Sequence, residues 1–166
     1  MIARYTLPEM GRLWEEEHKL RCWLKVEVAA CEAMAERGEI PKEAVSVIRQ
    51  KADFDLARVG EIEARVRHDV IAFLTAVGEK VGPESKYIHL GLTSSDMLDT
   101  ATAIQLVQAS DLLIGRVVKL REVLARRAHE FKMTPMIGRT HGIHAEPTTF
   151  GLKLALWYDE MGRDLA

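Results

Sequence analysis

One uninterrupted helical pattern, between Gly91 and Lys132, constrains the fold of this 166-residue chain more than any other feature. Apolar residues recur there in two adjacent stripes opposite a polar line, and no proline interrupts them. About 36 helical residues would span about 54 Å, whereas a compact chain of this length has a radius of gyration of only about 15 Å. We therefore expect an elongated helical bundle that needs more helices than this chain supplies. A homo-oligomer, further chain or both would provide them.

Shorter helical patterns fill most of the remaining sequence, so we expect an all-α fold. Gly38 and the pair Gly82-Pro83 are typical of helix ends, and Pro41 is typical of a first helical turn. The further helices are expected after Pro41 and over Leu13–Ala35, Phe54–Val66, Asp69–Val81 and Thr148–Ala166.

The same patterns predict two domains. Residues 1–92 form an N-terminal helical domain, and residues 93–166 form the beginning of a central helical-bundle domain. The last helical pattern stops without a cap or a polar tail. We therefore expect the central domain to be truncated and the chain to be the N-terminal piece of a longer protein.

Composition excludes several classes of protein. Hydrophobic residues make up 48% and charged residues 29%, which is ordinary for a globular protein and unlike a disordered or collagen-like chain. The net charge of −2 gives no bulk attraction to nucleic acid or to an anionic membrane. No apolar run approaches the roughly 20 residues of a membrane span, and the N-terminus lacks a signal-peptide layout. We expect a cytoplasmic protein without nucleic-acid or membrane partners.

Three segments break the helical pattern and are rich in groups that can do chemistry. Such irregular segments on rigid helices commonly carry catalytic groups. They are Arg67-His68-Asp69, the stretch from His89 to Asp96, and the stretch from Gly138 to Pro147.

Each segment also has a plainer interpretation. Asp96 suits a helix cap, and the His68-Asp69 pair suits a solvated helix start. His141 and His144 could suggest a metal pair, but no third ligand is evident. On chemistry alone His141 is the strongest catalytic candidate, because imidazole as a side-chain type suits proton transfer near neutral pH and glycines nearby let a ligand approach closely.

The chain has no Walker-type phosphate loop and no dinucleotide fingerprint. Any phosphate site must therefore use separate side chains, for which forked arginine donors and hydroxyl groups are suited. The candidates are Arg4, Arg67, Thr93 and Ser94.

These residues carry a family resemblance. In order along the chain, four stretches resemble the N-terminal part of the adenylosuccinate lyases, which belong to the fumarase/aspartase superfamily; the last two are the most specific. They are the stretches Arg4–Met10, Arg67–Val70, Gly91–Thr100 and Gly138–Pro147.

The resemblance implies a reaction and assigns roles to residues. Adenylosuccinate lyases release fumarate from adenylosuccinate to give AMP, and from a succinylated carboxamide ribotide earlier in purine biosynthesis. By the family pattern His141 is the general acid and His68 a second catalytic candidate. No metal or organic cofactor is expected, and family members are homotetramers whose active sites combine three subunits. The implied substrate-binding residues are Arg4, Tyr5, Arg67, His68, Asp69, His89, Thr93, Ser94 and Thr140.

One departure from the family pattern matters. The flexible loop Ser-Ser-x-Met-Pro-x-Lys-x-Asn, which supplies the catalytic base in the superfamily, is absent; Ser94-Ser95-Asp96-Met97 continues with Leu-Asp instead. We therefore expect the 166-residue chain to be inactive alone. Two alternatives stay open: another lyase of the superfamily, such as an argininosuccinate lyase or a carboxymuconate cycloisomerase, and a non-catalytic helical assembly module.

Overall fold

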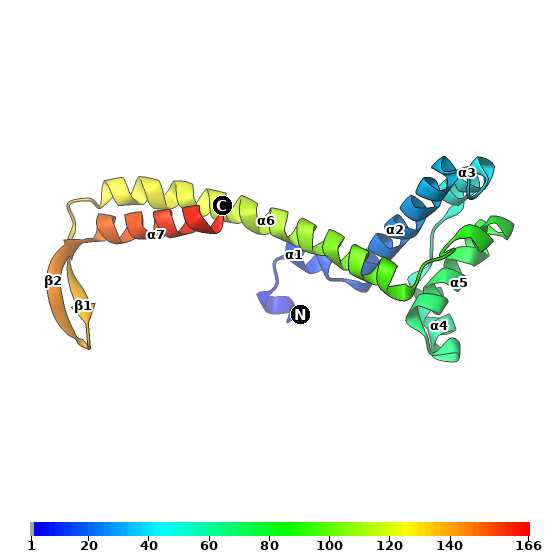
Figure 1. The fold of residues 1–166 in the computed structure, drawn as a ribbon. Coiled ribbons are helices and arrows are strands. Elements are labelled where there is room, and N and C mark those ends of the chain that lie inside the picture. Colours follow the sequence, from blue (N-terminus) through cyan, green and yellow to red (C-terminus); the bar gives the residue numbers. More distant parts are fainter. Residues whose placement is uncertain (1) are drawn as a thin grey trace. The chain divides into compact units, whose positions relative to one another are not determined.

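A computed structural model describes residues 2–166 (Figure 1). Contacts divide the chain into two compact units, one ending at Ala109 and the other beginning at Ser110. The helices are α1 (Pro8–Leu13), α2 (Glu16–Glu36), α3 (Lys42–Lys51), α4 (Leu56–Val66), α5 (Asp69–Val81), α6 (Ser94–Glu130) and α7 (Phe150–Asp164). The 3-10 helices η1 (Ala3–Tyr5) and η2 (Pro83–Tyr87) and the strands β1 (Pro135–Thr140) and β2 (Ile143–Thr149) complete the order.

The all-α expectation is confirmed. The long helix is α6, with 37 residues, and α5 has the predicted bounds. Gly38 follows the C-cap residue of α2 and adopts a left-handed φ of 74°, as its role as a helix stop predicts. The helix expected from Leu13 instead begins at Glu16, because the backbone is extended at Glu15 and a separate short helix, α1, ends before it.

The contact boundary falls inside α6, whereas the predicted domain boundary lies at residues 92 and 93, just before α6 begins. Compactness within one chain and domain organisation are different properties. We keep the boundary at residues 92 and 93 as a proposal about domains.

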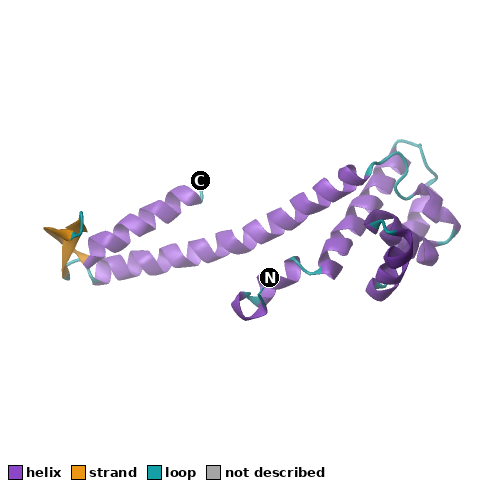
Figure 2. Cartoon of the chain, turned by 90° about the horizontal axis from the view of Figure 1, so that it is seen from below, coloured by secondary structure: helices purple, strands orange, loops and turns teal. Residues whose placement is uncertain are grey.

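The segment expected to be irregular, between Gly138 and Pro147, is instead part of a two-stranded antiparallel hairpin (Figure 2). Thr140 pairs with Ile143, so only His141 and Gly142 remain in the turn, with φ of 49° and 74°. Positive φ at both central residues is the geometry of a type I′ turn, whose twist matches that of paired strands. A His-Gly pair therefore closes a hairpin here.

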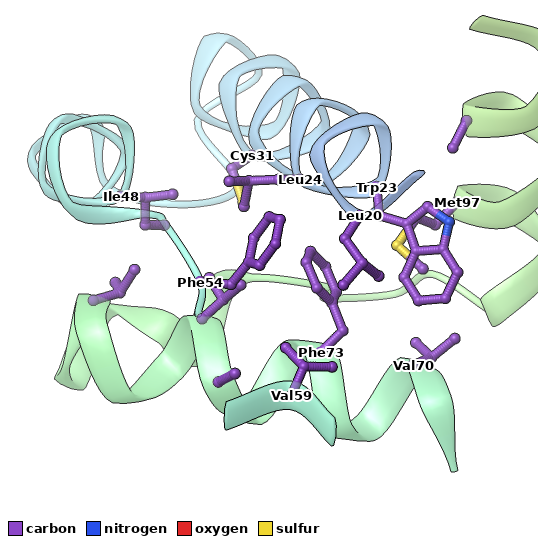
Figure 3. Packing of buried hydrophobic residues seen from close by; sticks show 14 of the residues in the cluster. Leu20, Trp23, Leu24, Cys31, Ile48, Phe54, Val59, Val70, Phe73 and Met97 are labelled. Atoms are coloured by element: carbon purple, nitrogen blue, oxygen red, sulfur yellow. The ribbon is translucent and has the colours of Figure 1, made fainter. Parts of the chain in front are cut away.

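The core of the first unit lies between α2, α3, α4, α5 and the start of α6 (Figure 3). Phe73 of α5 is fully buried; its ring meets Trp23 edge-on at 5.5 Å between centroids and Phe54 at 5.7 Å. Met97, in the first turn of α6, is also fully buried in this cluster. The segments that flank α5 and precede α6 are thus anchored on one apolar core.

An ion cluster sits on the surface of this unit. The Asp53 carboxylate accepts a hydrogen bond from Lys80 at 2.9 Å and one from Arg21 at 2.5 Å. These bonds hold the pKa of Asp53 well below its usual range, because they favour the ionised carboxylate. The cluster ties α2 and α5 to the segment between α3 and α4.

In the second unit α7 packs against the end of α6. A Cβ on Gly151 would lie 2.6 Å from the Lys132 backbone, so only glycine permits this approach. The guanidinium of Arg121 lies 4.4 Å from the ring centroid of Tyr158 and donates a hydrogen bond to its carbonyl oxygen. Large apolar side chains of this unit remain exposed, among them Leu113, Ile114, Leu152, Leu156 and Trp157.

Within residues 2–166, no helix combines the length and the apolar character that crossing a membrane requires.

Candidate active site

The segment Arg67-His68-Asp69 links α4 to α5. Arg67 is the C-cap of α4 and adopts the left-handed conformation, with φ of 54°. Its side chain is exposed. His68 caps α5: its Nδ1 accepts a hydrogen bond from the Ile71 backbone N–H at 3.4 Å. Because Nδ1 is the acceptor, the proton of the neutral ring is placed on Nε2.

Asp69 is the first residue of α5, where a carboxylate is favoured by the helix dipole. Its Oδ1 accepts the Val70 backbone N–H at 2.8 Å and lies 3.5 Å from His68 Nδ1. The plainer interpretation of His68-Asp69 as a helix start is therefore confirmed. The side chains are still about half exposed, at 52% and 56%, and can meet a ligand.

His89 follows η2 and is held by a residue that the sequence analysis did not single out. Its Nδ1 lies 2.5 Å from Glu27 Oε1, and its backbone N–H donates to Glu27 Oε2 at 2.9 Å. Glu27 comes from α2 and is only 1% exposed. A signal was present in the sequence: Glu27 lies at helical spacing among the apolar residues that α2 buries, including Leu20, Trp23 and Cys31.

Thr93 and Ser94 stand at the start of α6. The Thr93 backbone N–H donates to Asp96 Oδ2 at 2.8 Å, which is the reaching-back half of a capping box. The predicted capping role of Asp96 is thereby confirmed. The hydroxyl groups of Thr93 and Ser94 accordingly lie at a helix N-terminus, where backbone N–H groups favour anions.

Arg4 and Tyr5 lie together in η1. The Arg4 guanidinium sits 4.8 Å from the centroid of the Tyr5 ring, and both side chains are exposed. A stacked arginine beside a phenol can pair with a phosphate and contact a flat ring. Among residues 2–109, no hydrogen bond or ion pair joins these two residues to the other candidates of the first unit.

Thr140 and His141 belong to the second unit. Thr140 ends β1, and His141 occupies the tip of the hairpin with its side chain exposed. Two grooves lie in this unit. One, of about 630 Å³, is lined mainly by α6 and α7, and the other, of about 800 Å³, is lined mainly by β1 and α7. Neither Thr140 nor His141 lines either groove.

Three non-glycine residues among those described have positive φ: Arg67, His89 and His141. All three are candidates from the sequence. A left-handed conformation costs a residue with a side chain about 1–2 kcal/mol, which glycine would avoid. Backbone strain of this kind clusters at active sites, so these three positions remain candidates for a functional role.

The two histidines considered as a metal pair, His141 and His144, both lie in the hairpin. No group of three or more His, Cys, Asp or Glu residues in residues 2–166 could hold an ion. His144 pairs across the hairpin with Arg139, a cation, which is a poor neighbour for a metal ligand.

Comparison with known proteins identifies the family. A family model described as "Lyase" matches residues 3–166. The chain belongs to this lyase family. It is 58% identical over 164 residues to an adenylosuccinate lyase of Synechocystis and 53% identical over 165 residues to one of Bacillus subtilis. Each alignment covers 99% of this chain and 38% of the relative, so the chain spans well under half the length of these relatives.

Solved structures agree on the fold. A fumarate lyase of Mesorhizobium matches with a TM-score of 0.87 and 31% identity, over 94% of this chain and 38% of that one. A 3-carboxy-cis,cis-muconate lactonizing enzyme of Pseudomonas putida matches with a TM-score of 0.88 and 32% identity, over 98% and 39%. The expected fumarase/aspartase-like fold and the resemblance to adenylosuccinate lyase are confirmed.

Proposed function

We propose that this chain supplies part of a lyase that cleaves adenylosuccinate to AMP and fumarate, and cleaves the succinylated carboxamide ribotide in the same way, in purine biosynthesis. The observation that carries the proposal is the identity of 58% to an adenylosuccinate lyase, spread over 99% of the chain. The candidate residues add chemical support, because arginines, hydroxyl groups and histidines suit a substrate with a phosphate and two carboxylates.

The proposed reaction is a β-elimination. A base removes a proton from the succinyl carbon next to a carboxylate, the C–N bond breaks, and its electrons pass to the nitrogen. His141 protonates that nitrogen as the general acid, and His68 is the second catalytic candidate. A histidine suits proton transfer near neutral pH. No cofactor enters this scheme.

Substrate binding is proposed to involve several of the candidate side chains. Arg4 and Tyr5 contact the nucleotide, chiefly its phosphate, and Arg67 adds a second cation. The remaining proposed substrate-binding residues are His68, Asp69, His89, Thr93, Ser94 and Thr140. Fixed donors among them would stabilise the negative charge that develops on the succinyl carboxylate.

We also propose a cytoplasmic homotetramer in which subunits share active sites. Most of the candidate side chains are exposed in the single chain, as expected for half-sites that a neighbouring subunit completes. Exposed apolar residues on α6 and α7, such as Leu113 and Leu156, supply a surface for helices of another copy. Turnover by the 166-residue chain alone, at verified mass, would contradict the proposal that it is inactive.

A second candidate is another lyase of the superfamily, favoured by the structural match to the muconate lactonizing enzyme. The test is a substrate panel offered to the protein expressed from its full reading frame. Release of fumarate from adenylosuccinate, and none from argininosuccinate, supports the first candidate. Conversion of carboxymuconate alone supports the second.

A further inference from the structure

Buried Glu27 pairs with partly buried His89, and the proposed chemistry does not explain this pair. A buried carboxylate is unfavourable unless it is paired and hydrogen-bonded. Both oxygens of Glu27 meet this need through one residue: Oε2 accepts the His89 backbone N–H, and Oε1 lies 2.5 Å from His89 Nδ1. The pairing joins α2 to a residue that lies 62 positions further along the chain.

A second contact from α2 holds the same segment. The thiol of Cys31, one helical turn after Glu27, donates to the Tyr87 carbonyl oxygen at 3.4 Å. Burial, with the nearby carboxylates of Glu27 and Glu32, raises the pKa of Cys31 to about 11, so the thiol keeps the proton that it donates. Helix α2 thus fixes the backbone at residue 87 and both the backbone and the ring at residue 89.

The contacts between Glu27 and His89 hold a residue with a strained backbone. His89 adopts φ of 63°, a conformation that residues with a side chain rarely adopt. The Glu27 carboxylate accepts the N–H of this strained residue, and so helps to hold the strain in place. With Nδ1 facing Glu27, Nε2 is the ring nitrogen of His89 left for a ligand, and the His89 side chain is 18% exposed.

We propose that Glu27 is a positioning residue that fixes the ring tautomer of His89, with the proton on Nδ1 and with Nε2 directed to the substrate. The assignment follows from the contact at 2.5 Å, because a carboxylate without a proton can only accept hydrogen bonds and therefore needs a hydrogen on Nδ1. Nε2 is the ring nitrogen that remains for a ligand. The inference rests on the proposed function in one respect, namely that His89 contacts the substrate.

The substitution Glu27→Gln tests the tautomer. An amide has one acceptor oxygen and one NH₂ donor. If the oxygen continues to accept the His89 backbone N–H, the NH₂ group faces Nδ1, which must then give up its hydrogen. The variant is therefore expected to move the proton of the neutral ring from Nδ1 to Nε2.

Imidazole ¹⁵N chemical shifts of the 166-residue chain distinguish the two tautomers. Loss of signals in His89→Asn assigns the ring, and Glu36→Gln, at an exposed position of the same helix, is the matched control. We expect an Nδ1–H ring in the wild type and in the control, and an Nε2–H ring in Glu27→Gln. An Nε2–H ring in the wild type would overturn the inference. Because this observation is made on the wild type, it does not depend on whether the Glu27→Gln variant folds.

Kinetics of the protein expressed from its full reading frame test the positioning role. Because small misplacements of substrate-contacting groups are costly, we expect Glu27→Gln to lower kcat/KM for adenylosuccinate by about 10- to 100-fold, mainly through KM. Glu36→Gln should leave both constants unchanged. Unchanged kinetics in Glu27→Gln would overturn the positioning role. An inactive wild type would instead overturn the proposed function, whereas the tautomer result would stand.

Discussion

Phe73 allows a quantitative test of the core that anchors the candidate site. Its side chain is fully buried on α5, and its ring meets those of Trp23 and Phe54 edge-on, at 5.5 and 5.7 Å (Figure 3). Truncating a buried phenylalanine to alanine costs about 3–5 kcal/mol. Each aromatic pair adds about 0.5–1.5 kcal/mol beyond the area it buries. Measured truncation costs already include such ring contacts, so the two pairs place Phe73 in the upper part of that range, and we expect Phe73→Ala to lower the free energy of unfolding by about 4–5 kcal/mol.

Urea unfolding followed by Trp23 fluorescence measures this loss, since Trp23 lies within the same cluster. Trp14→Phe and Trp157→Phe in the background remove the other two tryptophans, so that the signal reports the first unit alone. With an m-value of about 2 kcal/mol/M, the midpoint should fall by roughly 2 M. The control is Ile71→Ala on the same helix, where the side chain is 47% exposed.

Ile71→Ala should change the free energy of unfolding by less than about 1 kcal/mol, as surface substitutions do. A loss below about 2 kcal/mol for Phe73→Ala, close to that of its control, would refute the packing argument. It would mean that the Phe73 ring does not fill the space between α2 and α5, and that the segments on either side of α5 lack the support described here.

Further predictions concern charge, close packing and ligand binding. Asp53→Asn should lower the free energy of unfolding by about 0.5–1 kcal/mol at neutral pH, a magnitude discounted because the ion cluster is exposed to solvent. Because folding lowers the Asp53 pKa, this difference should be present above about pH 4 and vanish as the pH falls below that value. Urea titrations at several pH values measure it. Gly151→Ala should lower stability by about 1–3 kcal/mol, since its Cβ would strike the end of α6. Gly60→Ala, in open space within α4, should raise it by about 0.5–1 kcal/mol, and melting temperatures compare the two. Arg4→Ala and Arg67→Ala should each raise the dissociation constant for AMP about tenfold, because each removes a charge-assisted hydrogen bond. Titration calorimetry measures this constant, and unchanged affinity in both variants would count against a nucleotide substrate.

Helices were the predictable part of this fold. The bounds of α5 follow from His68-Asp69 at one end and Gly82 at the other, and the long run of α6 follows from its unbroken apolar stripes. These signals are local, because a helix closes its hydrogen bonds within a few residues. The hairpin was missed because its strands are short and contain proline and glycine, which are unusual in strands, and because its turn has His141 where asparagine or aspartate is usual.

The candidate residues were likewise predictable only where a motif carried them. Arg67, His89 and His141 were identified from the sequence, but their left-handed backbones, which set them apart, are visible only in three dimensions. Glu27 was missed because its partner lies 62 positions away, and no local pattern connects them. A single acid within an apolar helix stripe shows that a partner must exist but not which residue it is.

The central claim is that this chain belongs to an enzyme that cleaves adenylosuccinate. The most direct test follows the ultraviolet absorbance of adenylosuccinate after the protein expressed from its full reading frame is added, with AMP and fumarate identified as products. The account predicts a steady fall in absorbance that His141→Gln abolishes or greatly slows. No change with a folded wild-type protein, or an undiminished rate in His141→Gln, would contradict it.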